Sequence, residues 1–109
     1  MSAPELPLEV TVAEAADMRA KGAAIVDVRE PWEFDQGHIE DALLIPLKSL
    51  PQRVAEVPRD RPVVINCHHG GRSMQAVNYL RQQGFGNVTN MEGGIDRWSL
   101  EIDPSIARY

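Results

Sequence analysis

The chain contains one cysteine, Cys67, which stands where a run of apolar residues gives way to a glycine-rich turn. The apolar run Val63–Asn66 predicts a buried strand, and the pattern after Ser73 predicts a helix. The first N–H groups of a helix have no intrahelical partner and favour an anion in front of them. A thiol held there is stabilised as the thiolate, which is the nucleophilic form. The spacing therefore predicts a catalytic cysteine.

The residues that follow the cysteine have the composition of an anion-binding loop. Two glycines allow successive backbone N–H groups to converge on one point. An arginine adds a permanent charge and a fork of donors suited to an oxyanion. A lone cysteine is more often a small buried hydrophobe, but an inert one does not require such a turn. We expect the substrate anion to be bound by His68, His69, Gly70, Gly71, Arg72 and Ser73.

Composition and charge exclude several classes of function. The 109 residues suit one domain, and the formal net charge of -5 comes without any run of Lys and Arg. That charge argues against nucleic acid and acidic membrane surfaces as partners. One cysteine cannot form an intramolecular disulfide, and neither a signal peptide nor a segment of transmembrane length is visible. We expect a cytoplasmic protein that uses no cofactor.

Strands and helices must alternate along the chain to position this loop. Periodicity and caps predict strands near residues 8–10, 23–28, 42–45, 63–66 and 88–91, helices over 11–21, 31–37, 74–84 and 95–100, and a weak helix at 47–57. This alternation predicts an α/β domain with a central, mostly parallel sheet flanked by helices. We expect a single domain over 1–109, with a loose N-terminal arm at 1–7 and a C-terminal tail at 101–109.

Four motifs, in this order, resemble those of the rhodanese-like (sulfurtransferase) domains. They are Asp27-Val-Arg29-Glu-Pro-Trp-Glu33-Phe, Gly37-His38-Ile39 with Ala42-Leu-Leu-Ile-Pro-Leu47, Cys67 to Ser73, and Gly93-Gly94-Ile-Asp-Arg-Trp98. The resemblance covers almost the whole chain and implies a rhodanese-like three-layer domain. It also implies a reaction: the cysteine takes a sulfane sulfur from thiosulfate or a persulfide donor and passes it to a thiol or to cyanide.

Loop length separates two kinds of chemistry within the resembled fold. Six residues run from Cys67 to Arg72, both included. The similar dual-specificity cell-cycle phosphatases and arsenate reductases carry one residue more, which makes a cradle for a tetrahedral phosphorus or arsenic centre. The shorter loop fits a sulfur atom, and a phosphatase would also need a general acid. Sulfur transfer is therefore favoured over phosphate chemistry.

A second function of a different class stays open at this point. The chain is alternatively a sulfur-carrier or binding module that delivers persulfide sulfur to a protein partner with little turnover of thiosulfate. The sequence hardly separates this carrier from an enzyme. A catalytically dead regulatory domain is opposed by the presence of Cys67 and Arg72.

Residues outside the loop are candidates for supporting roles. Asp27 and Arg29 follow a predicted strand, at the end where open α/β sheets place their sites. Arg29 is either a second charge near the loop or, as we favour, a scaffold residue paired with an acidic neighbour. His38 is expected to be structural, because in the resembled family this position helps to fix the preceding loop.

Two further residue groups need a simpler interpretation. A metal site at Cys67, His68 and His69 is disfavoured, because adjacent side chains point apart and zinc ligands normally have wider spacing. The aromatic residues Trp32, Phe34 and Trp98 are expected in the core or at a pocket rim. An acidic chain without basic interleaving does not favour base stacking.

Overall fold

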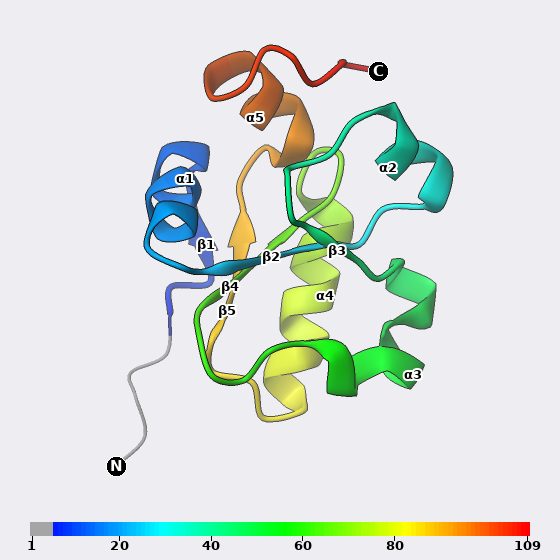
Figure 1. The fold of residues 1–109 in the computed structure, drawn as a ribbon. Coiled ribbons are helices and arrows are strands. Elements are labelled where there is room, and N and C mark those ends of the chain that lie inside the picture. Colours follow the sequence, from blue (N-terminus) through cyan, green and yellow to red (C-terminus); the bar gives the residue numbers. More distant parts are fainter. Residues whose placement is uncertain (1–5) are drawn as a thin grey trace.

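A parallel sheet of five strands forms the centre of the computed structural model, which describes residues 6–109 (Figure 1). Part of the predicted N-terminal arm, residues 1–5, lies outside the described residues. Every strand pair is parallel, and the strand order is β1-β5-β4-β2-β3. The strands are β1 (Glu9–Val10), β2 (Ala24–Asp27), β3 (Leu43–Leu44), β4 (Val63–Asn66) and β5 (Val88–Met91). The predicted α/β architecture is confirmed.

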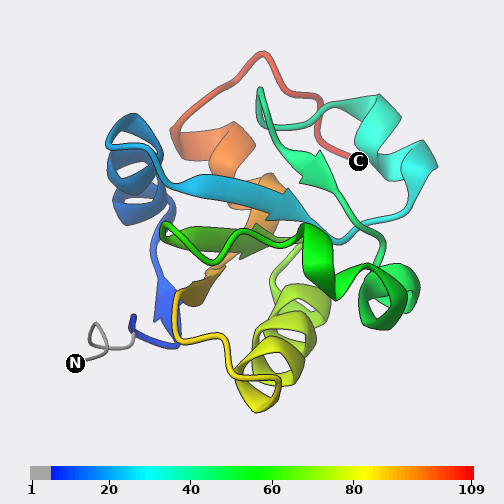
Figure 2. The ribbon, with the colours of Figure 1, turned by 60° about the horizontal axis from the view of Figure 1, so that its bottom comes forward.

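Helices cover both faces of this sheet and enclose two hydrophobic cores (Figure 2). The helices are α1 (Val12–Ala20), α2 (Pro31–Gln36), α3 (Leu50–Arg53), α4 (Gly71–Gln82) and α5 (Gly94–Glu101). One core joins α3 and α4 to the sheet and includes Ile65 and Leu80. The other joins α1 and α5 to the opposite face and includes Val64 and Trp98. Because successive side chains of a strand point to opposite faces, neighbouring residues of β4 serve different cores.

The sequence signals at element ends are confirmed in some places and wrong in others. Thr11 caps α1 with the predicted capping box, in which its side chain accepts from the Glu14 N–H at 3.1 Å. The strand predicted at 42–45 is shorter in the structure, where β3 spans Leu43–Leu44, because the chain then turns into a 3₁₀ segment whose N-cap is Pro46. The weak helix predicted over 47–57 is broken into α3 between two short 3₁₀ segments, with Pro51 in the first turn of α3.

The topology brings two chain segments together at the carboxyl end of the sheet. The chain leaves β4 toward β5 and leaves β2 toward β3, which lie on opposite sides of the β4–β2 pair. A crevice forms outside the carboxyl ends of two neighbouring strands where their connections diverge in this way. Cys67 follows β4 directly, and Asp27 ends β2. The fold therefore places the cysteine loop beside the turn that leads into α2.

The C-terminal tail, for which the sequence predicts no element, folds back over the domain toward α2 (Figures 1 and 2). Ile106 is buried, and its carbonyl accepts a hydrogen bond from the hydroxyl of Ser99 on α5. Arg108 pairs with Asp96 at 2.9 Å. These contacts hold the tail against the same end of the sheet as the cysteine loop. No helix among residues 6–109 is long and apolar enough to cross a bilayer.

Candidate active site

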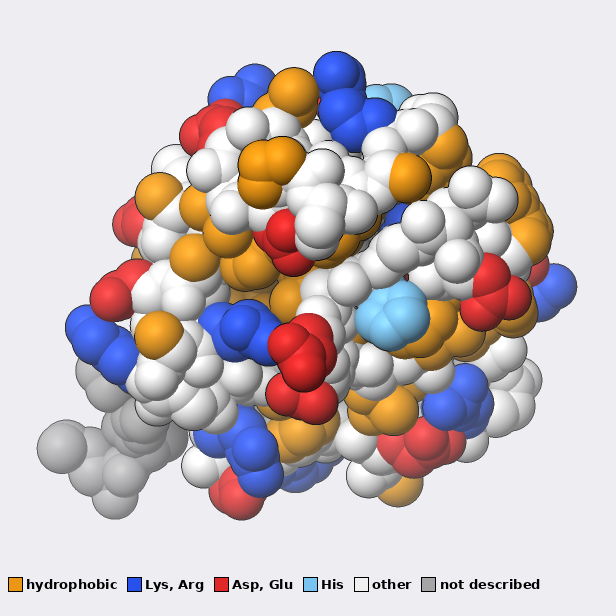
Figure 3. Space-filling model, turned by 45° about the horizontal axis from the view of Figure 1, so that its top comes forward, with side chains coloured by type: hydrophobic (Ala, Val, Ile, Leu, Met, Phe, Trp, Pro, Cys, Tyr) orange, Lys and Arg blue, Asp and Glu red, His pale blue; other side chains and the backbone are white. Residues whose placement is uncertain are grey.

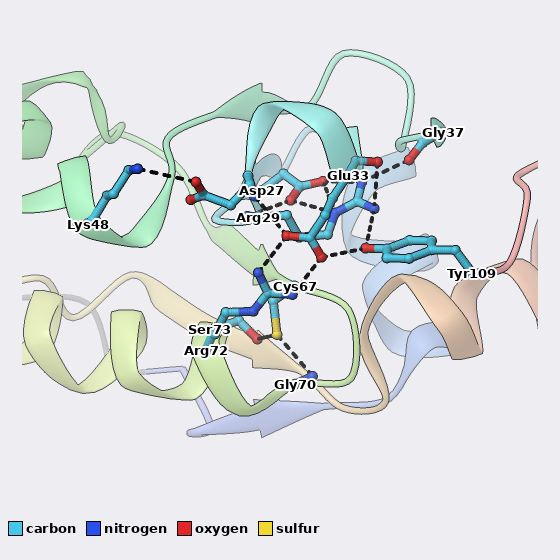
Figure 4. A network of polar contacts seen from close by, with 11 residues as sticks. Asp27, Arg29, Glu33, Gly37, Lys48, Cys67, Gly70, Arg72, Ser73 and Tyr109 are labelled. Atoms are coloured by element: carbon cyan, nitrogen blue, oxygen red, sulfur yellow. Dashed lines mark hydrogen bonds and ion pairs between the residues drawn. The ribbon is translucent and has the colours of Figure 1, made fainter. Parts of the chain in front are cut away.

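The thiol of Cys67 lies enclosed between the end of β4 and the beginning of α4 (Figure 4). Cys67 is only 1% exposed, and its Sγ accepts the N–H of Gly70 at 3.0 Å. Gly70 is the N-cap of α4 with φ 111°, a backbone conformation that favours glycine. The twelve-residue helix thus begins immediately beside the sulfur. Its unpaired first-turn N–H groups and its dipole favour negative charge on that sulfur.

A second polar group reaches the sulfur from the first turn of α4. The Ser73 hydroxyl lies 3.3 Å from Cys67 Sγ and 2.5 Å from the Asn90 side-chain carbonyl. Asn90 is itself oriented, because its amide donates to Glu9 at 2.8 Å and to the Gly70 carbonyl at 3.3 Å. A hydroxyl has one proton, so Ser73 donates to the sulfur or to Asn90 but not to both at once. This residue can therefore respond to the charge on Sγ.

The backbone of the loop is held from the other side by the N-terminus of α5. The N–H groups of Ile95 and Asp96 donate to the carbonyls of Cys67 and His68, at 2.8 and 3.1 Å. Gly94 permits this approach: a Cβ on it would lie 2.6 Å from the Cys67 carbonyl oxygen, and its φ is 61°. These two carbonyls accept from N–H groups that α5 leaves unpaired, while on the other side of the loop the Gly70 N–H donates to the sulfur.

Arg72 forms a bidentate ion pair with Glu33 of α2 (Figure 4). The two N–O distances are 2.6 and 2.8 Å, and the side chain of Glu33 is 5% exposed. The guanidinium lowers the pKa of Glu33 from 4.5 to about 2, against the opposing effect of burial. The same pairing raises the pKa of Arg72. The expectation that Arg72 presents its fork to a substrate anion differs from this arrangement, in which both terminal nitrogens are engaged by Glu33.

Asp27 and Arg29 form a buried ion pair behind this contact. Arg29 is fully buried and donates to both carboxylate oxygens of Asp27, at 2.8 to 3.1 Å. It also donates to the carbonyls of Glu33 and Gly37, at 3.2 and 2.8 Å. Arg29 therefore ties the C-terminal half of α2 to the end of β2. This geometry favours the scaffold role over a second charge at the loop.

Comparison with known proteins agrees with this geometry. The family model of the rhodanese-like domain matches residues 11–101. The chain belongs to the rhodanese-like domain family. It is 49% identical over 83 residues to a protein named sulfurtransferase from Allochromatium vinosum, a match covering 76% of this chain and 78% of that one. It is 40% identical over 85 residues to the thiosulfate sulfurtransferase GlpE of Stutzerimonas stutzeri, with 78% of each chain covered.

A solved rhodanese-like structure shows the same architecture. The crystal structure of a rhodanese-related protein from Thermoplasma volcanium superposes with a TM-score of 0.81 at 33% identity. The superposition covers 88% of this chain and 94% of the other. The three-layer rhodanese-like fold predicted from the motifs is thereby confirmed.

The three histidines of this rhodanese-like chain lie in different settings. The ring of His68 is stacked between those of His69 and Tyr109, with centroids 3.9 and 4.0 Å away. Burial, and then the nearby His69, lower the pKa of His68. His38 is exposed; it stacks on Phe34 at 3.6 Å, and its Nδ1 lies 2.9 Å from the Phe34 carbonyl. Its contacts brace the end of α2, as a structural role requires.

The aromatic predictions have mixed outcomes. Trp98 is buried at 4% exposure and belongs to the core with α1 and α5. Phe34 is half-buried beside His38. Trp32 is 61% exposed, so of the two places expected for it the structure excludes the core. Its position on a short helix at the molecular surface leaves it only an edge contact with Tyr109, at 5.9 Å between centroids.

One group of residues in the described part of the chain has ligand atoms close enough to consider a metal. These atoms belong to His68, His69 and Asp96 and lie within 4.8 Å of one another. The lone pairs of an imidazole lie in the ring plane, and the two rings are stacked at an angle of 25°. Those lone pairs run side by side instead of converging, and Asp96 is already paired with Arg108. This arrangement weighs against a metal site.

Several residues of the site were not anticipated in these roles. Glu33 lies within a recognised motif, but its pairing with Arg72 joins residues 39 positions apart. Asn90 had a usable signal, since it is a polar residue in a wholly buried strand. Tyr109 had no such signal, because nothing in the tail sequence indicates where it packs.

On the face shown in Figure 3, acidic and basic side chains are interspersed, and neither sign of charge forms a large patch.

Substitution of Gly94 tests whether α5 supports the loop. We expect Gly94→Ala to destabilise the protein by about 2 kcal/mol or more, because the new Cβ meets the loop carbonyls. Gly22→Ala is the matched control: Gly22 has φ 102° but nothing within 4 Å of its Cβ position. Gly22→Ala should lower the free energy of unfolding by about 1 kcal/mol, from the unfavourable backbone conformation alone. Chemical denaturation measures the loss in both variants, and equal losses would contradict the inference that α5 supports the loop through Gly94.

The pH dependence of stability tests the Glu33 ion pair. In the folded state the pKa of Glu33 is lowered from 4.5 to about 2. The ionised carboxylate therefore contributes its full stabilisation above about pH 4.5, and this stabilisation is lost as the pH falls toward about 2. Glu33→Gln should therefore cost about 2 kcal/mol at pH 7, and the difference from wild type should shrink across that window. Denaturation curves between pH 2 and pH 7 measure it.

The exposed pair of Arg53 and Glu56 supplies the control for this experiment. It has the same bidentate geometry, at 2.7 and 2.8 Å, but lies in solvent. Glu56→Gln should change stability much less than Glu33→Gln, because water screens the pair. If Glu33→Gln lowers stability no more than Glu56→Gln, or if its effect does not vary with pH, then burial does not strengthen the Arg72–Glu33 pair.

Proposed function

We propose that this protein is a sulfurtransferase that carries a sulfane sulfur on Cys67. The donor is thiosulfate or a persulfide, and the acceptor is a thiol or cyanide. The observation that carries the proposal is the position of the Cys67 sulfur, which accepts the Gly70 N–H at the N-terminus of α4. The similarity to proteins named sulfurtransferase and thiosulfate sulfurtransferase supports it.

The first half of the proposed reaction loads the cysteine. The Cys67 thiolate attacks the sulfane sulfur of thiosulfate, a sulfur–sulfur bond forms, and the original sulfur–sulfur bond breaks with its electron pair leaving on sulfite. The products are a Cys67 persulfide anion and sulfite, so charge and atoms balance. The terminal persulfide sulfur is an anion, and the loop N–H groups and the α4 dipole would stabilise it without a metal.

The second half returns the cysteine to its starting state. The acceptor attacks the terminal sulfur of the persulfide, and the Cys67 thiolate leaves. With cyanide the product is thiocyanate; with a thiolate it is a new persulfide. Ser73 suits both halves, because its single proton can donate to Sγ while that atom carries negative charge and turn to Asn90 once the persulfide has formed. We place this chemistry in the cytoplasm.

Mass spectrometry after incubation with thiosulfate is the decisive test of the function. We expect wild type to gain one sulfur atom at Cys67 and to lose it on addition of cyanide, with thiocyanate released. Cys67→Ser should remain unmodified and folded, because the side chains differ by one atom. An unmodified wild-type thiol would overturn the proposal. Stable loading without catalytic turnover would instead indicate the carrier alternative.

Substitution of Arg72 tests its part in donor binding. We expect Arg72→Ala to raise the KM for thiosulfate by about tenfold, which corresponds to the loss of one charge-assisted hydrogen bond. Arg72→Lys keeps the positive charge but not the forked pair of donors, so its KM for thiosulfate should lie between those of wild type and Arg72→Ala. Circular dichroism at pH 7 checks folding, since Arg72→Ala leaves the Glu33 carboxylate without its cation. Unchanged kinetics with thiosulfate would remove Arg72 from the site.

A further inference from the structure

Tyr109, in the C-terminal tail, contacts the charged residues behind the cysteine loop (Figure 4). Its hydroxyl lies 3.0 Å from Arg29 Nη1 and 2.9 Å from Glu33 Oε2. Its ring stacks on His68 with an interplanar angle of 10°. The side chain is thus fixed by three contacts with residues 41 to 80 positions away along the chain. These contacts place a hydroxyl group between two charges of opposite sign.

The direction of these hydrogen bonds follows from the groups involved. A guanidinium only donates, so the Tyr109 oxygen accepts from Arg29. An ionised carboxylate only accepts, so the Tyr109 proton is donated to Glu33. Arg29 is fixed by the buried Asp27 and does not reach the Glu33 carboxylate directly in the contacts of the described residues. Tyr109 therefore bridges the buried guanidinium of Arg29 and the carboxylate of Glu33 through its hydroxyl group.

Glu33 faces a particular difficulty if Arg72 binds a substrate. Both terminal nitrogens of Arg72 are on the Glu33 carboxylate, which is 5% exposed. An arginine that turns to the oxyanion of a donor leaves this buried charge without its cation, and an unpaired buried charge is strongly unfavourable. Two donors remain: the Glu30 N–H at 2.9 Å on one oxygen and the Tyr109 hydroxyl on the other.

We propose that Tyr109 is a positioning residue for binding of the sulfur donor. Its hydroxyl keeps the Glu33 carboxylate hydrogen-bonded when Arg72 turns to the oxyanion of that sulfur donor. Figure 4 shows the Arg72 side chain beside Cys67, between the loop and Glu33, so the turn is a local one. The inference rests on the sulfurtransferase function proposed above. It assigns the tail a role in loading the cysteine and none in discharging it.

Tyr109→Phe isolates the hydroxyl, because it keeps the ring that stacks on His68. Without the hydroxyl, Glu33 depends more on Arg72 and holds it more tightly. We expect kcat/KM for loading by thiosulfate to fall by about tenfold, while the rate at which cyanide discharges preloaded persulfide stays unchanged. Tyr79→Phe makes the same chemical change on α4 and should alter neither rate.

A double-mutant cycle with Glu33→Gln separates this role from a structural one. A neutral amide does not bind Arg72 as an ion pair, so Tyr109→Phe added to Glu33→Gln should have little further effect on loading. An equal effect in both backgrounds, an unchanged loading rate in Tyr109→Phe alone, or an equal fall of loading and discharge would each overturn the inference. A wild-type protein that gains no sulfur from thiosulfate overturns the proposed function itself, which is a distinct result.

Discussion

The buried carboxylate of Glu33 is the group on which the arrangement of the site depends. Four hydrogen bonds converge on it: two from Arg72, one from the Glu30 N–H and one from Tyr109. They come from the first turn of α4, from the start of α2 and from the C-terminal tail. A buried charge is costly unless it is paired and hydrogen-bonded, so the resting structure brings these three segments together in one geometry. The position of the cysteine loop relative to α2 follows from that requirement.

The N-termini of two helices hold the cysteine loop. One helix donates to carbonyl groups of the loop, and the other is capped by a glycine whose N–H donates to the sulfur. The N-terminus of α5 donates to the carbonyls of Cys67 and His68, and at the N-terminus of α4 the Gly70 N–H donates to Sγ. Both interactions use groups that a helix leaves unpaired, so no additional polar side chain has to be buried to form them. The electrostatic environment of the sulfur is therefore in place before any substrate arrives, which is the condition under which such dipoles contribute most to a reaction.

The parts of the fold that could be predicted are those with a local physical cause. The apolar runs of β2 and β4 and the capping box at Thr11 are encoded in adjacent residues, and the structure confirms them. Predictions stayed open or were wrong where packing or backbone chemistry beyond the local pattern decides. Trp32 was expected in the core or at a pocket rim, and the core is excluded because it lies on a two-turn helix whose inner face is taken by Glu33. The segment after β3 does not form a continuous helix, because Pro51 has no N–H with which to continue the hydrogen bonds of the turn before it.

The sequence by itself determined the family and the candidate reactive groups: a single thiol, followed by glycines and an arginine at the junction of a strand and a helix, within four motifs of that family. Those features are set by residues that are close together in the chain. The tertiary structure alone decided which groups face one another. Arg72 is paired with Glu33 across 39 residues, and Tyr109 reaches the same carboxylate across 76. Such contacts depend on the strand order β5-β4-β2 and on the path of the tail, and no local pattern records either of them.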